Sequence, residues 1–132
     1  MSRTDLTAAR LAPQPADYSI DAKGKLVRVK FGKKLNAAAI GSYASQLAAD
    51  PSFHPDFSEI VDLRDVEEAD LQADDFLKLA DKIDPFSPTA KRAFVVQTVT
   101  QQHAARMHQI LRSERNIAIF STIEEAEIWI AS

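Results

Sequence analysis

The first clear pattern in the chain is an alternation of hydrophobic and polar residues in two short segments, residues 18–21 and 26–31. Alternation with a period of two is typical of strands that are buried on one face. The intervening residues 22–25 contain Gly24, and glycine adopts positive φ more easily than other residues. The pattern therefore predicts a β-hairpin with Gly24 in its turn.

Four later segments carry apolar residues three and four positions apart, the spacing that places them on one face of a helix. Each segment is bounded by residues that commonly start or stop helices. The first helix is predicted to start after an Asn36 cap and to stop at Asp50, which precedes Pro51, and the second to cover residues 70–83. The third is predicted to start at a capping box of Thr98 and Gln101, and the last at Ser121 or Thr122.

Three apolar segments lie between the predicted helices and predict strands, at residues 60–64, 91–97 and 116–120. The middle one is almost continuously apolar, which is typical of a strand covered on both faces. This alternation favours an α/β fold with a mixed, mostly parallel sheet, a leading β-hairpin and about four helices. Residues 1–17 have no sustained period and are interpreted as a mobile N-terminal arm, and residues 18–132 as a single domain.

Composition excludes several classes of protein. The chain has 132 residues, a formal net charge of −3 and no cysteine. A small negative charge does not fit non-specific nucleic-acid binding, and the lack of cysteine excludes disulfides and thiolate metal sites. No apolar run approaches the roughly 20 residues that span a bilayer, and the N-terminal residues do not resemble a secretory signal. We therefore expect a cytoplasmic protein without a membrane span or a nucleic-acid partner.

The sequence contains no motif for cofactor binding or catalysis. Its three glycines, Gly24, Gly32 and Gly41, do not form the phosphate-binding loop of a nucleotide site. His103 and His108 are five residues apart, about 140° around a helix, so they are poorly placed to share a metal ion. No serine lies in a nucleophile elbow. We therefore expect no metal, no cofactor and no catalytic residue, and an enzyme of unknown type is the least favoured interpretation.

Charge is distributed unevenly along the chain. Residues 23–34 contain six basic residues and no acidic one, whereas residues 56–75 contain nine acidic residues and a single basic one, Arg64. Basic residues on a hairpin commonly protect an edge strand from aggregation, and acidic residues before a helix commonly form a solvated loop. The alternatives are that the acidic stretch docks a basic partner, or that the two stretches meet between two copies in a homodimer.

Asp62 and Arg64 are an unusual charged pair in the predicted central strand, because they share one of its faces. If helices cover that face, the two side chains are expected to form an ion pair that satisfies both charges. If they do not pair, Arg64 is well suited to bind a carboxylate or a phosphate.

The order of elements resembles that of a known family. The leading hairpin, the three α/β units, Ile-Val-Asp-Leu-Arg at residues 60–64 and Ile-Ala-Ile-Phe-Ser-Thr-Ile-Glu-Glu-Ala-Glu-Ile-Trp-Ile at residues 117–130 are similar to the bacterial STAS-like proteins. These are stand-alone relatives of the anti-sigma-factor antagonist domain, and the resemblance covers residues 18–130. It implies an α/β sandwich that docks proteins or holds a small ligand. Regulatory members are phosphorylated on a serine or threonine at the helix after the central strand, and residues 67–74 contain neither.

The resemblance and the residues lead to two functional hypotheses. The first is a non-enzymatic protein-interaction or regulatory domain, also able to self-associate, which docks its partner through Asp65, Glu67, Glu68, Asp70, Thr98, Gln101 and Gln102. The alternative is a carrier or sensor of a small apolar or anionic ligand, bound between sheet and helices near Arg64, His103 and Met107. A cavity of about 300 Å³ or more would favour the carrier, and a filled core with exposed apolar groups would favour docking.

Overall fold

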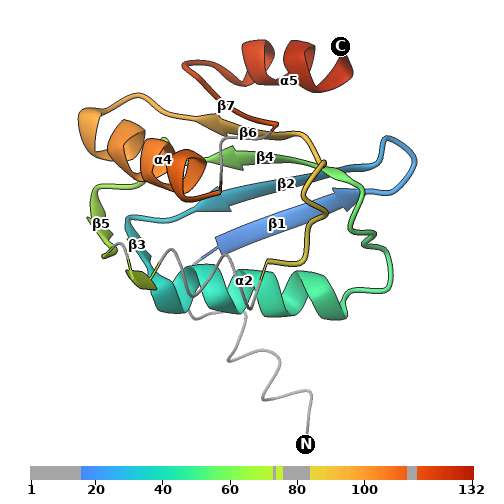
Figure 1. Ribbon diagram of the computed structural model, residues 1–132, viewed down its shortest axis with the longest axis horizontal. Helices are drawn as coiled ribbons and strands as arrows, with labels where there is room; N and C mark the ends of the chain where they lie inside the picture. Colours follow the sequence, from blue (N-terminus) through green and yellow to red (C-terminus); the bar gives the residue numbers. More distant parts are fainter. Residues whose placement is uncertain (1–15, 73, 76–83, 113–115) are drawn as a thin grey trace, which may run out of the picture.

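The chain folds around a five-stranded mixed sheet with helices on both faces (Figure 1). The computed structural model describes residues 16–72, 74–75, 84–112 and 116–132. In chain order the elements are β1 (Ala16–Asp21), β2 (Leu26–Phe31), β3 (Lys34–Asn36), α2 (Ala37–Ala49), β4 (Ser58–Asp62), β5 (Glu68–Asp70), β6 (Arg92–Val95), α4 (Val99–Leu111), β7 (Ile117–Phe120) and α5 (Ile123–Ala131).

The main sheet has the strand order β1-β2-β4-β6-β7. β1 is antiparallel to β2, and the other three neighbouring pairs are parallel. A separate two-stranded parallel sheet joins β3 to β5. Because β3 follows β2 and β5 follows β4, this small sheet lies beyond the carboxyl ends of the main strands (Figure 1).

Helices α2 and α4 cover one face of the main sheet, and α5 covers the other (Figure 1). Each face buries its own apolar cluster, so the fold is held together by a larger and a smaller core. The larger core includes Val27, Val29, Leu47, Leu63 and Phe94, and the smaller one consists of Ile60, Ala93, Val95 and Ala126 with half-buried neighbours. Among the described residues, no helix has the length and apolar character that crossing a membrane requires.

The predicted hairpin is present, and β1 begins at Ala16, two residues before its expected start. The predicted conformation of its turn is wrong, because the residue with positive φ is Lys25, at 56°, and not Gly24. Gly24 instead lies close to the side chain of Asp21. Its N–H donates to Asp21 Oδ1 at 2.9 Å, and a Cβ at this position would lie only 2.5 Å from Asp21 Oδ2.

Side-chain caps fix the starts of the helices as the sequence predicts. Asn36 Oδ1 accepts a hydrogen bond from the N–H of Ala39 at 2.8 Å, and α2 ends at Ala49 with Asp50 as its C-cap. Of the two predicted starts for the last helix, the structure has Thr122, whose hydroxyl accepts from the N–H of Glu125 at 3.1 Å. Such bonds satisfy backbone donors that the first turn of a helix leaves free.

The central strand β4 ends at Asp62 and not at residue 64, as the apolar run 60–64 predicts. The chain turns immediately afterwards, because the N–H of Val66 donates to the carbonyl of Leu63 at 3.0 Å. The side chains of Leu63 and Val66 both remain buried. The N–H of Leu63 still donates to the carbonyl of Val95 at 3.0 Å, so burial and one further backbone bond explain why the apolar pattern extends beyond the strand.

The predicted helix over residues 70–83 is wrong at its first residue. The carbonyl of Lys33 accepts from the N–H groups of Glu67 and Glu68 at 2.8 and 3.0 Å, and this pairing draws the segment through Asp70 into strand β5. Residues 74–75 are helical, and residues 73 and 76–83 lie outside the described part of the chain. Across the described ranges there are three longer helices where four are predicted.

Candidate functional site

An open depression of about 680 Å³ lies at the carboxyl ends of the parallel strands. The loops that follow β2, β4 and β6 form its walls, so it occupies the position at which open α/β sheets commonly bind ligands and partners. We call it the carboxyl-end surface, and its residues are Gly32, Lys33, Arg64, Asp65, Val66, Glu67, Thr98, Thr100 and Gln101.

Gln101 holds the walls of this surface together from inside. Its Nε2 donates to the carbonyls of Arg64 and Val66 at 3.1 and 2.9 Å. Its Oε1 accepts from the N–H groups of Gln97 and Thr98 at 2.7 and 3.2 Å, and Thr98 completes the predicted capping box of α4. These four bonds use the full capacity of the amide. Because Gln101 is only 1% exposed, the prediction that it contacts a partner is replaced by a positioning role.

The other residues of the predicted docking set are mostly at the surface. Glu67, Glu68, Asp70 and Gln102 are exposed. Asp65 forms an ion pair with Lys30 of the same chain at 3.2 Å, so part of the expected attraction between hairpin and acidic stretch is satisfied within one molecule.

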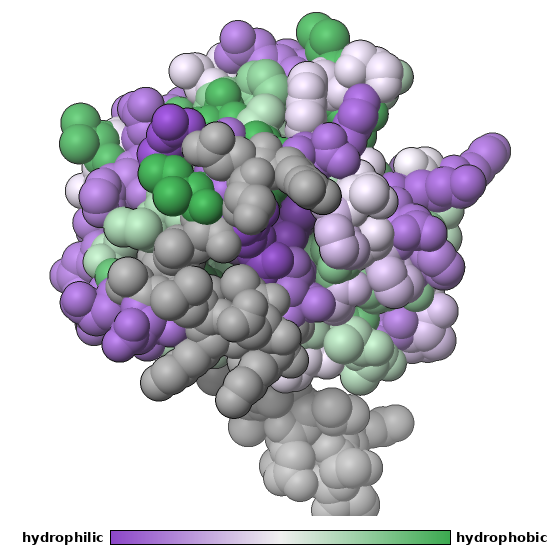
Figure 2. Space-filling model, in the orientation of Figure 1, coloured by the Kyte–Doolittle hydropathy of each residue, from purple (hydrophilic) through white to green (hydrophobic). Residues whose placement is uncertain are grey.

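Val99 is a surface residue that inspection of charges and polar groups missed. It is the first residue of α4, next to Thr98 and Thr100, and its side chain is 85% exposed. On the face in Figure 2, hydrophobic residues form small separate patches among hydrophilic ones. An almost fully exposed apolar residue between two residues that line a depression, Thr98 and Thr100, is the feature that the sequence could have indicated in the first turn of a capped helix.

Asp62 and Arg64 form the predicted ion pair. Arg64 Nε and Nη2 each donate to one carboxylate oxygen of Asp62 at 2.9 Å. Burial by itself would raise the pKa of Asp62, but the hydrogen bonds from the side chain and backbone of Arg64 lower it below its ordinary value. Because two donors of the guanidinium are already engaged, the pair satisfies itself at the edge of the carboxyl-end surface.

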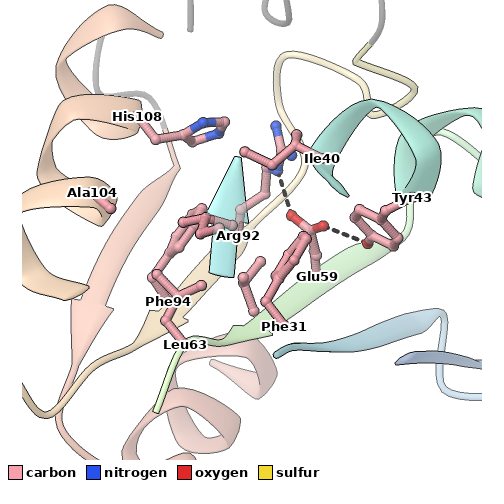
Figure 3. A pocket seen from close by; sticks show the side chains of 11 residues that line it. Phe31, Ile40, Tyr43, Glu59, Leu63, Arg92, Phe94, Ala104 and His108 are labelled. Atoms are coloured by element: carbon pink, nitrogen blue, oxygen red, sulfur yellow. Dashed lines mark hydrogen bonds and ion pairs between the residues drawn. The ribbon is translucent and has the colours of Figure 1, made fainter. Parts of the chain in front are cut away.

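A second, smaller pocket lies between the sheet and the two helices α2 and α4, with a volume of about 60 Å³ (Figure 3). Its lining is mainly apolar and consists of Phe31, Leu35, Ile40, Tyr43, Glu59, Val61, Leu63, Arg92, Phe94, Ala104 and His108. The residues predicted for the alternative ligand site, Arg64, His103 and Met107, are not among them.

The rotation of α4 explains the difference. Ala104 and His108 are four residues apart and share the inward face of the helix, and both point into the pocket in Figure 3. His103 is one position earlier, about 100° around the axis, and is exposed. Met107 is half-buried outside the lining.

One wall of the small pocket carries charged groups that are almost completely buried. Glu59 is 1% exposed, and its two carboxylate oxygens accept from the Tyr43 hydroxyl at 2.6 Å and from Arg92 Nε at 2.9 Å (Figure 3). Arg92 Nη1 donates to Asp84 at 2.8 Å, and Arg112 also pairs with Asp84. We call Glu59, Asp84, Arg92 and Arg112 the buried charge cluster.

The cluster changes the protonation behaviour of its neighbours. Burial raises the pKa of Tyr43 well above its ordinary value, and the Glu59 carboxylate raises it further. Burial would lower the pKa of Arg92, but Glu59 and Asp84 outweigh this effect and raise it. The pKa of His108 is lowered well below its ordinary value by burial and by the positive charges of Arg92 and Arg112. The cluster therefore favours the charged form of Arg92 and the neutral form of the neighbouring His108 imidazole.

The described residues contain no group of three or more histidine, aspartate or glutamate side chains that could hold a metal ion. The polar atoms of Glu59 and Gln101 are engaged in hydrogen bonds within the fold. What this region can offer a partner is the shape and the exposed carboxylates of the carboxyl-end surface and, next to it in the chain, the exposed apolar side chain of Val99.

Comparison with known proteins identifies the fold. No family model matches the sequence, and no curated protein matches it. One solved structure superposes on this chain with a TM-score of 0.62 and 19% sequence identity. The superposition covers 90% of this chain and 96% of the solved one. It is an uncharacterised protein of the DUF3478 family from Shewanella loihica PV-4, described as having a SpoIIAA-like fold. The SpoIIAA-like fold is the STAS-like fold, so the resemblance found in the sequence is confirmed at the level of architecture, and this chain is an α/β protein with the STAS-like fold.

Proposed function

We propose that this chain is a non-enzymatic interaction or regulatory domain of the cytoplasm, and that it docks a protein partner on the carboxyl-end surface. The observation that carries the proposal is Val99, which is 85% exposed and lies in the chain between Thr98 and Thr100, two residues that line a depression whose walls are fixed in advance. An exposed apolar side chain surrounded by polar groups gains free energy when a partner removes it from water.

The rigidity of the surface supports this function. Gln101 ties the loop after β4 to the start of α4 through four hydrogen bonds, and Thr98 caps the same helix. A partner therefore meets loops that are already ordered, which reduces the entropy lost on binding.

The charges of the surface indicate the chemistry of the partner. Glu67, Glu68 and Asp70 are exposed, and none of them forms an ion pair with another described residue. Lys33, whose carbonyl accepts from the N–H groups of Glu67 and Glu68, contributes a positive charge beside them. We infer a partner segment with an apolar side chain for Val99 and basic side chains for the carboxylates.

Photo-crosslinking tests the proposal with an internal control. A photoreactive residue is placed at position 99 in one variant and at position 110 in another, because Ile110 is the other exposed apolar residue of α4, at 51% exposure. In the cells that produce the protein, we expect one protein to be crosslinked from position 99 and not from position 110. The same adduct from both positions, or none from position 99, would contradict docking at this surface.

Binding measurements then connect the adduct to the surface. With the crosslinked protein purified, we expect Val99→Gln to raise its Kd by about tenfold or more, as for a hot-spot residue, and the matched Ile110→Gln to change it by less than about twofold. Charge neutralisation in Glu67→Gln/Glu68→Gln is expected to weaken binding and to flatten its dependence on salt. Equal effects of the two glutamine substitutions on α4 would refute the assignment of Val99 as the anchor.

The small pocket supports one alternative, a carrier or sensor of a small apolar ligand. Apolar walls with a few polar groups on one side are typical of ligand sites, but the volume of about 60 Å³ is well below the roughly 300 Å³ of most such pockets. Mass spectrometry of the natively purified chain decides between the two functions, because a stoichiometric co-purified lipophile would favour the carrier.

A further inference from the structure

The small pocket and the carboxyl-end surface are built from the same elements. Leu63 lines the pocket, and Arg64, the next residue in the chain, lines the surface. On α4, Gln101 lines the surface, and Ala104, about one turn later, lines the pocket. The two sites have no lining residue in common, but they share these walls. Because protein interiors are densely packed and transmit strain, displacing a wall of the pocket also displaces the surface.

Both helices that cover the pocket are tied to the surface by hydrogen bonds. On α4, Gln101 donates to the carbonyls of Arg64 and Val66. The helix α2 follows directly on β3, which pairs with β5. The carbonyl of Lys33, just before β3, accepts two N–H groups of the loop after β4. Outward movement of either helix is therefore passed to the loop after β4.

The lining of the pocket indicates what it can hold. Most of its side chains are aliphatic or aromatic (Figure 3). The Tyr43 hydroxyl and Arg92 Nε both donate to Glu59, so the polar groups of this wall are directed at one another. The buried charge cluster holds two carboxylates and two guanidinium groups, so its formal charges cancel. Such a pocket favours a neutral apolar occupant over water or an ion.

We propose that a small, uncharged apolar molecule binds in the small pocket and that its binding changes the shape of the carboxyl-end surface. The volume of about 60 Å³ is less than half that of a cavity of about 150 Å³ that binds benzene in another protein. A ligand of that size therefore has to displace the walls. The strands under the pocket are joined by backbone ladders, so the helices and the end loops give way first. The ligand then regulates docking, a step that rests on the function proposed above.

Nuclear magnetic resonance of the full chain, titrated with two apolar probes, tests the proposal without a partner protein. Xenon is a single atom that fits the existing volume, so we expect it to shift the amide signals of pocket residues, such as Val61 and Ala104, and few others. Benzene exceeds the volume. We expect it to bind saturably with a Kd on the order of 1 mM and to shift the signals of residues 32–33 and 65–68 as well.

Two kinds of variant separate binding from coupling. Ala104→Leu extends a side chain into the pocket and is expected to weaken benzene binding by at least about tenfold, whereas the matched His103→Leu, outside the lining, should change it by less than about twofold. Gln101→Ala removes the link between α4 and the loop after β4, so benzene should still bind while the shifts of residues 65–68 shrink by at least about half. If circular dichroism shows that Ala104→Leu is unfolded, Val61→Ile, which adds one carbon on the sheet side, takes its place.

The proposal is overturned if benzene gives no saturable shifts up to its solubility, or if it binds and the signals of residues 65–68 do not move. Neither result involves a partner, so neither bears on docking, which fails on its own if position 99 crosslinks no protein. With a crosslinked protein in hand, we expect saturating benzene to change its Kd by at least about threefold in the wild type and not in Ala104→Leu. An unchanged Kd in the wild type would overturn the regulatory step.

Discussion

Replacing Arg92 by methionine tests how the buried charge cluster stabilises the fold. Arg92 lies directly opposite Glu59 in the parallel β4–β6 pair. Its Nε donates to Glu59 at 2.9 Å and its Nη1 to Asp84 at 2.8 Å. Methionine fills much of the space of the arginine stem and carries no charge. The substitution therefore removes both ion pairs while Glu59 remains 1% exposed.

The expected cost follows from the charge that is left behind. Removing one partner of a buried ion pair costs about 3–5 kcal/mol. Tyr43 still donates to Glu59, and Arg112 still pairs with Asp84, so we expect a value near the lower end, about 3 kcal/mol. The Arg92 guanidinium also lies 4.6 Å from the centre of the Phe86 ring, a contact that contributes about 0.5–2 kcal/mol. We therefore expect a total loss of about 3–5 kcal/mol, a large share of the 5–15 kcal/mol typical of a domain.

Urea denaturation followed by the fluorescence of Trp129 measures this loss. The double variant Glu59→Gln/Arg92→Met separates charge from packing, because glutamine retains an acceptor for the Tyr43 hydroxyl but carries no charge. We expect the second substitution to recover at least half of the free energy of unfolding lost in Arg92→Met. If Arg92→Met costs less than about 1 kcal/mol, or if the double variant is as unstable as the single one, an uncompensated charge is not the cause.

Three further predictions concern single residues. The pKa of His108 is lowered in the fold, so the unfolded state binds a proton first as the pH falls below about 6.5. The free energy of unfolding is therefore expected to decrease by up to about 1.4 kcal/mol per pH unit until the folded pKa is reached. Urea denaturation midpoints between pH 7.5 and 5.5 should show this slope in the wild type and a smaller slope in His108→Gln. Gln101→Ala leaves two loop carbonyls without a donor and should lower the free energy of unfolding by at least about 2 kcal/mol. Amide hydrogen exchange in residues 64–68 should become faster, and unchanged exchange there would refute the positioning role of Gln101. In the hairpin turn, Lys25→Gly should be neutral or stabilising by up to about 1 kcal/mol because φ is positive there. Gly24→Ala should change stability by less than about 1 kcal/mol, because the exposed Asp21 carboxylate that its Cβ meets can rotate away, and thermal denaturation of both variants will test these expectations.

Local patterns were sufficient for most of the architecture. The period-two alternation of residues 26–31 reappears as alternating burial in β2, and the caps at Asn36 and Thr98 begin helices as predicted. These features depend on residues that are close in the chain, where geometry restricts the possible structures. The resemblance to STAS-like proteins had the same local basis and is confirmed at the level of the fold.

Features that depend on pairing between distant segments were not accessible in this way. Strand β5 exists because the carbonyl of Lys33 accepts hydrogen bonds from Glu67 and Glu68, more than 30 residues later. The acidic composition of residues 67–70 gave no sign of a strand, because acidic residues are depleted in strands. The buried charge cluster has the same origin, because Glu59 and Arg92 meet only through the β4–β6 register. Glu59 is two residues from Val61, and Arg92 is two residues from Phe94, so each charged residue shares the inward face of its strand with an apolar one. A charged residue on an otherwise apolar face was therefore the signal that the sequence offered.

The candidate site shows why polar residues at a loop are a poor guide to docking. Gln101 and Asp62 were conspicuous in the sequence because they are polar near strand ends, yet each uses its polar atoms within the fold. A side chain whose hydrogen bonds are satisfied internally gains little from a partner, whereas an exposed apolar side chain gains from any partner that removes it from water. Val99 and Ile128 meet this second condition, at 85% and 72% exposure, on two separate surfaces. If docking occurs at the proposed surface, its free energy is therefore expected to come from Val99, and the charges around Val99 to select the partner.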